Sequence, residues 1–192
     1  MRPLRKLTVA ALALALPALL ATHANAASYN IDNAHTSVIF KVMHLGIAPF
    51  YGRFNKVSGS FTYDAKSPAA STLSVEIDVN SIFTADRKRD DHLKSPDFFN
   101  AKQFPTITIK STKVAGSGDT LKVTADVTVR GITKSLTFDV KKTGEGKDPW
   151  GNERVGFEGS LTIDRMDFGV SYMPDGLGKQ VTILFALEGV KG

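Results

Sequence analysis

The chain has 192 residues, no cysteine and a formal net charge of +5. The lack of cysteine excludes a fold held together by disulfides, so a stable domain must depend on its hydrophobic core. The modest charge excludes a typical nucleic-acid-binding protein, because such proteins carry a clustered basic patch.

The first 26 residues have the pattern of a cleavable signal peptide. Three basic residues precede an apolar run at 7–20, and Ala24-Asn25-Ala26 forms a small-x-small cleavage site. The run is shorter than the roughly 20 residues that span a membrane, although a retained N-terminal anchor is the alternative. We expect cleavage after Ala26, a periplasmic or secreted location and a single domain at 27–192, with a net charge of 21 − 19 = +2.

Strand patterns follow in nearly unbroken order after this segment. Tyr29 to Asp32 is interpreted as a short lead-in, and 46–52, which contains Pro49, as a turn. Alternation of apolar and polar residues predicts about eight strands, at 35–44, 53–63, 73–80, 107–114, 121–129, 136–140, 155–163 and 181–187. Short turns between them predict an antiparallel all-β domain of the size of a sandwich or barrel, and its eight strands can close into a barrel.

One segment, at 89–111, interrupts the strand patterns. Ser95 is interpreted as the N-cap of a short helix and Pro96 as its first residue, with Asp97 favourable in the first turn. Leu93, Phe98, Phe99 and Phe104 then provide one apolar side. We predict a short α-helical cap between strands that lays aromatic rings over the end of the barrel.

An eight-stranded barrel encloses a space that is filled by its own side chains or holds one slender ligand. Strands of about ten residues tilted by ~40° give a height of about 25 Å, enough for an extended lipid-like chain. The inward rows and the cap provide the candidate ligand-binding residues, for which ordinary core packing is the alternative: Val38, Phe40, Val42, His44, Phe54, Ile77, Val79, Leu93, Phe98, Phe99, Ile107, Ile109, Val127, Phe138 and Phe168.

Charged residues at the start of the cap have two interpretations. Arg89, Asp90 and His92 either hold the cap by an ion pair and hydrogen bonds or contact the head group of a ligand. The dense basic run at 87–89 is followed by Asp90 and Asp91, and is most simply a solvated loop, with membrane or polyanion docking as the alternative.

Signatures of common catalytic sites are missing from the sequence, including GxSxG, HExxH, a P-loop and GxGxxG after a strand. Neither Ser37 nor Ser111 has an identifiable activating base. No ligand spacing links the histidines and carboxylates that could form a metal site, namely His35, His44, His92, Asp32, Asp90 and Asp91. We therefore predict no catalytic residue, no metal and no cofactor.

The motifs of the chain resemble those of the YceI-like family of exported, lipocalin-like proteins. Matching stretches occur in the family's order across residues 29–190: Asp32-x-x-His35, Gly52-Arg53-Phe54, Arg89-Asp90-x-His92-Leu93-x-Ser95-x-Asp97-Phe98-Phe99, Phe104-Pro105-Thr106-Ile107, Val129-Arg130-Gly131 and Asp164-Arg165-Met166-Asp167-Phe168-Gly169. The resemblance implies an elongated eight-stranded antiparallel lipocalin-like barrel whose apolar lumen holds a polyisoprenoid, an isoprenoid quinone or a similar long amphiphile. It also implies transport, storage or sequestration of that lipid, including in stress responses and capture of hydrophobic antibiotics, and a possible homodimer.

Two other functions are compatible with the sequence. An enzyme that acts on a lipid or quinone would use His44 or His92 with a nearby carboxylate. A protein-interaction module with a solid core would bind no lipid at all. Neither nucleic acid nor more than transient membrane contact is expected.

Overall fold

The computed structural model describes residues 26–192. Apart from Ala26, the predicted signal peptide lies outside these residues. Within them, no helix is both long enough and apolar enough to cross a membrane.

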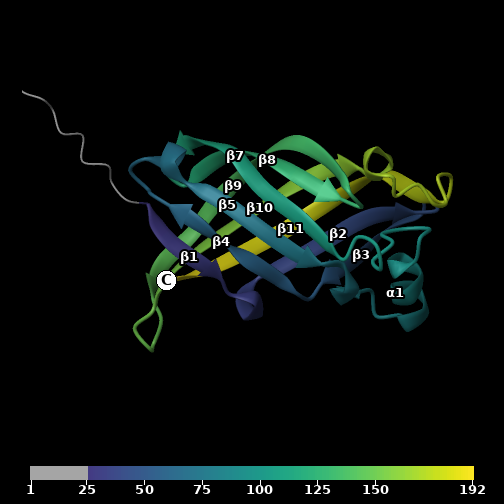
Figure 1. Ribbon diagram of the computed structural model, residues 1–192, viewed down its shortest axis with the longest axis horizontal. Helices are drawn as coiled ribbons and strands as arrows, with labels where there is room; N and C mark the ends of the chain where they lie inside the picture. Colours follow the sequence, from purple (N-terminus) through teal and green to yellow (C-terminus); the bar gives the residue numbers. More distant parts are fainter. Residues whose placement is uncertain (1–25) are drawn as a thin grey trace, which may run out of the picture.

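The described chain is built of strands, with one α-helix near one end of the long axis and the C-terminus near the other (Figure 1). The strands are β1 (Ala27–Ile31), β2 (Ser37–His44), β3 (Ala48–Phe54), β4 (Val57–Tyr63), β5 (Thr72–Asp78), β6 (Ile82–Phe83), β7 (Thr106–Ser117), β8 (Thr120–Val129), β9 (Ile132–Lys147), β10 (Glu153–Asp164) and β11 (Leu177–Lys191). The helices are η1 (Asn33–His35), η2 (Pro68–Ala70), η3 (Val79–Ser81), α1 (Arg87–Lys94) and η4 (Arg165–Phe168).

Eight long strands form a closed antiparallel barrel, which confirms the predicted fold class. Three of them are interrupted, because β1 continues into β2, β3 into β4, and β5 into β6. Two of the interruptions are single helical turns, in which Asp32 and Asp78 each accept a hydrogen bond from the backbone N–H two residues later. Pairing of β1 with β11 closes the ring.

Two predictions about the first hairpin were wrong. Residues 29–31 of the lead-in belong to β1, which pairs with both β4 and β11, and Asp32 is the N-cap of η1. The five residues of β1 are too few for a clear alternation. The predicted turn at 46–52 is mostly strand, because β3 begins at Ala48 and Pro49 lies opposite Met43. β3 pairs with β6 only through Arg53 and Phe54, so Pro49 lies where one edge of the strand is free, a position that tolerates proline.

The helix in the cap also begins earlier than predicted. Asp86 is its N-cap and accepts a hydrogen bond from the backbone N–H of Arg89 at 2.9 Å, whereas Ser95 is its C-cap. A proline disfavours helical geometry at the residue before it, so Pro96 marks the end of the helix and not its start. Below, "the cap" denotes α1 and the turns at 95–104.

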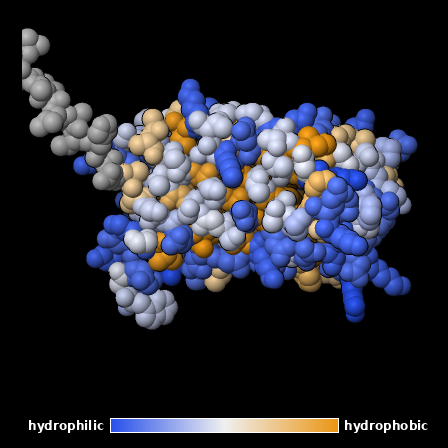
Figure 2. All heavy atoms as spheres, in the orientation of Figure 1, coloured by the Kyte–Doolittle hydropathy of each residue, from blue (hydrophilic) through white to orange (hydrophobic). Residues whose placement is uncertain are grey.

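Two apolar clusters divide the barrel along its length. The α1 half lies under the cap and contains Phe40, Phe54, Ile77 and Ile107. The far half contains Phe61, Tyr63, Phe157 and their neighbours. Figure 2 shows hydrophilic residues over the end that carries α1 and hydrophobic atoms visible between polar ones along the body.

Candidate ligand-binding cavity

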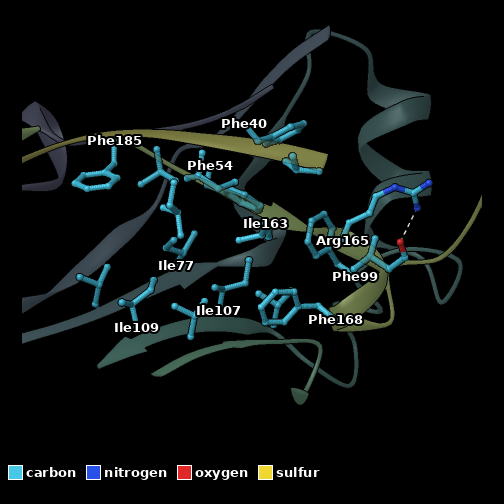
Figure 3. Close-up of a pocket in the computed structure, with 18 of the residues that line it drawn as sticks. Phe40, Phe54, Ile77, Phe99, Ile107, Ile109, Ile163, Arg165, Phe168 and Phe185 are labelled. Atoms are coloured by element: carbon cyan, nitrogen blue, oxygen red, sulfur yellow. Dashed lines mark hydrogen bonds between the residues drawn. The ribbon is translucent and has the colours of Figure 1, made fainter. Parts of the chain in front are cut away.

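A cavity of about 190 Å³ lies in the α1 half. Its wall draws side chains from the strands around the barrel and from the cap, and all of them are apolar except Arg165 (Figure 3). The polar atoms of Arg165 bond to backbone oxygens, so carbon atoms form the inner surface. Such a space favours hydrocarbon over water, because water needs polar partners to remain in a cavity.

Aliphatic side chains contribute 17 of the 25 residues that line the cavity, and seven phenylalanines with Arg165 complete the wall. Three of the aliphatic residues, Ile77, Ile107 and Ile163, are spread around the space in Figure 3. Phe138 and Phe185 meet edge to face with 5.9 Å between their ring centroids, and they line the cavity where the far half begins.

The cap closes one end of the cavity with apolar side chains. Leu93, Phe98 and Phe99 line the space, and the Phe99 ring meets Phe54 edge to face at 5.9 Å. Asp90 accepts two hydrogen bonds from Thr84, at 2.8 Å from the backbone N–H and 2.6 Å from the hydroxyl. These contacts tie the start of α1 to the chain that leads into it.

Arg89 and His92 also have protein partners. Arg89 donates to the Thr84 hydroxyl at 2.9 Å and to the Thr84 carbonyl at 2.6 Å, and its guanidinium lies over the Phe50 ring. His92 bonds to Asp97 at 2.8 Å and packs against Phe98 and Tyr172. Neither Arg89 nor His92 lines the cavity, and the same is true of Asp90, so the structure does not bring the predicted head-group residues to its wall.

Arg165 holds the β10–β11 connection over this end of the barrel. The side chain is buried and donates five hydrogen bonds, all to backbone carbonyl oxygens between Val170 and Gly178, at 2.5–3.3 Å. Burial lowers the pKa of the guanidinium from its ordinary value, although an arginine stays protonated. Because every donor has an acceptor inside the connection, Arg165 acts as a fixed support and its charge is not free for a ligand.

The structure places thirteen of the fifteen candidate ligand-binding side chains in the cavity wall. The two exceptions lie at strand ends. His44 is exposed at the end of β2, and Val79 is buried in η3, just beyond the end of β5, where the alternation stops. Each prediction assumed that the alternation of inward residues continues for one more inward position than it does.

Strand alternation could have found most of the wall residues that were not predicted. The last two long strands, β10 and β11, repeat the inward pattern, but the candidate set includes no residue from either strand. The additional wall residues are Leu73, Val75, Val129, Leu161, Ile163, Arg165, Val170, Leu177, Val181, Ile183, Phe185 and Leu187. Arg165 had no such signal, because an arginine next to a strand gives no indication of burial.

The suggested metal residues do not form one group. His35, Asp32 and Glu188 come together in the far half, but Arg154 donates to Asp32 at 2.7 Å and to Glu188 at 2.6 Å. Hydrogen bonds from Arg154 and His35 lower the pKa of Asp32 to about 2. The arginine thus supplies the positive charge that these carboxylates need, which favours an ion-pair cluster over a metal site.

An eight-stranded antiparallel barrel with an apolar cavity under a helical cap defines the class of lipocalin-like barrels. Residues 29–189 match the YceI-like domain, and the chain belongs to this family.

Known proteins resemble the chain over most of its length. A UPF0312 protein of Pseudomonas aeruginosa is 43% identical over 188 residues, which cover 97% of this chain and 98% of that protein. The crystal structure of Burkholderia cenocepacia BcnA superposes with a TM-score of 0.76 at 26% identity, covering 82% of this chain and 98% of BcnA. A polyisoprenoid-binding domain from Saccharophagus degradans has the same fold, with a TM-score of 0.68 at 15% identity and coverage of 86% and 99%.

Proposed function

We propose that this protein is an exported carrier that holds the hydrocarbon chain of one long amphiphile in the cavity of the α1 half. The ligand class is a polyisoprenoid, an isoprenoid quinone or a similar lipid, and the role is transport, storage or sequestration, including of hydrophobic antibiotics. The single observation that carries the proposal is the apolar inner surface of the cavity under the cap. The name of the Saccharophagus degradans domain, which describes polyisoprenoid binding, points in the same direction.

Burial of hydrocarbon is sufficient to account for useful affinity. Removing roughly 400 Å² of apolar ligand surface from water is favourable by on the order of 10 kcal/mol. Immobilising the ligand costs several kcal/mol, which leaves affinities from about micromolar to nanomolar. Binding of this kind selects for length and shape, and only weakly for chemical identity.

Positions of the titratable groups favour a carrier over an enzyme. Neither His44 nor His92 lines the cavity, and Arg165 is the one ionisable side chain among the wall residues in the described part of the chain. General acid–base catalysis requires a titratable group within hydrogen-bond reach of the reacting atoms. The exported location rests on the predicted signal peptide.

A charge placed inside the cavity tests the proposal. Ile109→Lys puts an ammonium on the wall, whereas Thr108→Lys puts the same group on the neighbouring outward position, opposite Glu76. We expect lipid extracted from purified Ile109→Lys protein to fall below a tenth of the wild-type amount, since a buried unpaired charge is strongly unfavourable. Thr108→Lys should keep its lipid. Equal lipid content in two folded variants, measured by mass spectrometry of the extract, would contradict the proposal.

A further inference from the structure

The barrel wall is incomplete between β9 and β10. These strands pair from Glu153 opposite Lys147 to Gly159 opposite Val140. Beyond this point, residues 132–139 pair only with β8, and residues 160–164 pair only with β11. The two unpaired edges face each other, because β9 and β10 are neighbours in the ring. We call this interruption the seam.

The seam is bounded at both ends. Pairing of Gly159 with Val140 closes it toward the far half. Toward the cap, Arg130 in the β8–β9 turn donates a hydrogen bond to the Gly169 carbonyl after η4, at 3.0 Å. The seam is therefore a gap in the wall of the α1 half that is closed at both of its ends.

Three side chains at the seam border both the cavity and the outer surface. A groove of about 710 Å³ lies on the outer surface of this region, and its wall shares Phe138, Leu161 and Phe185 with the cavity. Leu161 and Phe185 are only partly buried although they face inward. Gly159 lets the Phe185 ring lie against the backbone, because a side chain at Gly159 would overlap that ring.

Opening the seam requires less disruption than opening the cap. Side-chain rotations of Leu161 and Phe185 break no hydrogen bond, and such rotations are fast. The cap end is held by the five hydrogen bonds of Arg165, and by Arg130, which also donates to the Phe98 carbonyl at 2.5 Å. A route through the end that displaces the cap or the β10–β11 connection breaks several of these bonds together.

A positive charge lies beside the seam. Lys134 is directly opposite Val127 in the β8–β9 register, and residues directly opposite each other share a face of the sheet. Lys134 therefore belongs to the inward row, yet it is exposed and lines neither the cavity nor the outer groove, which places it on the unpaired edge of β9 toward the cap. Within residues 26–192, no carboxylate forms an ion pair with it: the pairs involve other lysines and arginines.

The size of the cavity also calls for an opening. An engineered cavity of about 150 Å³ in another protein holds one benzene. The space here is about 190 Å³, so a long amphiphile fits only with part of its length outside. The far half offers no continuation, because Phe61, Tyr63 and Phe157 fill it.

We propose that the seam is the side entrance of the cavity, and that the ligand is an amphiphile whose anionic head group stays in the seam beside Lys134. The hydrocarbon tail passes Leu161 and Phe185 into the α1 half, and unpaired backbone N–H groups along the seam supply further donors. This inference rests on the proposed function and adds the route of loading and the charge of the head group.

Tethering the seam tests the route. Thr137 and Thr162 line the outer groove on opposite sides of the seam, and the chain has no cysteine, so Thr137→Cys/Thr162→Cys is bridged specifically by a cleavable bismaleimide. The probe is cis-parinaric acid added to delipidated protein, with its fluorescence followed by stopped flow. We expect the bridge to slow loading about tenfold or more, because a blocked route lowers the association rate. Cleaving the bridge should restore the rate.

Two further tethers are the controls. Ser60→Cys/Ser74→Cys carries the same bridge across β4 and β5, which are already paired, and should load at the wild-type rate. His92→Cys/Tyr172→Cys ties the cap to the β10–β11 connection, where the two rings lie 5.0 Å apart, and should also load normally. Slow loading with the cap tether and normal loading with the seam tether would overturn the side entrance in favour of the end.

Two probes that share one hydrocarbon chain and differ in charge test the head group. Lys134→Gln should weaken binding of cis-parinaric acid about three- to fivefold, the modest size expected of an exposed ion pair. It should leave binding of the methyl ester of the same acid unchanged. Equal effects on acid and ester would overturn the role of Lys134. Wild-type protein that binds neither probe would contradict the proposed function itself, whereas binding of both with no effect of the seam tether would contradict only the side entrance.

Discussion

The two halves of the barrel share one strand pattern but differ in what fills them. In the far half, the Phe157 ring meets Phe61 at 5.5 Å and Tyr63 at 5.2 Å, both nearly edge to face, so aromatic rings span the interior. In the α1 half, a cavity remains between seven phenylalanines and a largely aliphatic wall that includes Ile77 and Ile163. The comparison teaches that the direction of a side chain decides whether it faces the interior, and that contact between rings from opposite walls decides whether the interior is solid.

The far half is also where charged groups reinforce the wall. Arg154 of β10 donates to Asp32 after β1, to Asp148 in the β9–β10 loop and to Glu188 of β11, which joins these segments. We infer a division of labour in which the far half supplies stability and the α1 half binds the ligand. The following predictions test this division, beginning with the largest expected effect.

Truncation of an interior side chain should be costly in the far half and mild in the α1 half. Phe157→Ala should lower the free energy of unfolding by about 3–5 kcal/mol, because it removes a ring from packed surroundings. Ile163→Ala removes a partly exposed side chain that already borders a cavity and should cost only about 1 kcal/mol. Urea unfolding of delipidated protein measures both values. Equal costs would mean that the two halves are packed alike.

Enlargement of an interior side chain should show the reverse order of tolerance. Val123 and Val127 are both inward on β8, but only Val127 lines the cavity. Val123→Phe should cost about 1–3 kcal/mol through overpacking. Val127→Phe should change the free energy of unfolding by less than about 1 kcal/mol while lowering the amount of bound parinaric acid. If Val127→Phe is more destabilising than Val123→Phe, the inferred division of labour between the two halves is contradicted.

Acid should weaken the far half through Asp32. The pKa of this carboxyl falls from 3.8 to about 2 in the folded protein, so the native state favours its ionised form. The resulting stabilisation is complete above pH 3.8 and disappears as the pH falls from 3.8 to about 2. The urea midpoint should decline over this interval, and the decline should be smaller in Arg154→Gln. If the urea midpoint of Arg154→Gln depends on pH in the same way as that of the wild type, Arg154 is not the cause of the lowered pKa of Asp32.

Tryptophan fluorescence should report on one half only, and this is the smallest expected effect. Trp150, the sole tryptophan, is 81% exposed in the β9–β10 loop and does not line the cavity. Its emission should stay constant when a lipid binds. In Trp150→Phe/Phe54→Trp, the new indole borders the cavity and its emission should shift on binding. A shift of Trp150 emission in the wild type would indicate that the far half responds to the ligand.

Much of the barrel could be predicted from the sequence, because alternation in strands such as β8 shows which side chains face inward. The cavity in the α1 half could not be predicted, since alternation does not show whether residues from opposite walls meet. The position of α1 was misjudged because Ser95-Pro96 is compatible with either end of a helix, and only the hydrogen bond of Asp86 identifies the start.

The seam was likewise beyond prediction from single strands. It arises from pairs that β9 and β10 do not make, and a strand's own pattern does not specify how far its neighbour follows it. One signal is visible in retrospect. Lys134 interrupts the inward row of Ile132, Leu136 and Phe138, as a polar residue at an opening would.

Native mass spectrometry of the protein purified from its own host tests the central claim most directly, because it detects a ligand acquired under natural conditions. The account predicts one added amphiphile per chain, lost in Ile109→Lys and retained in Thr108→Lys. A wild-type protein that carries only its own mass, and takes up no long-chain amphiphile when one is offered, would contradict it.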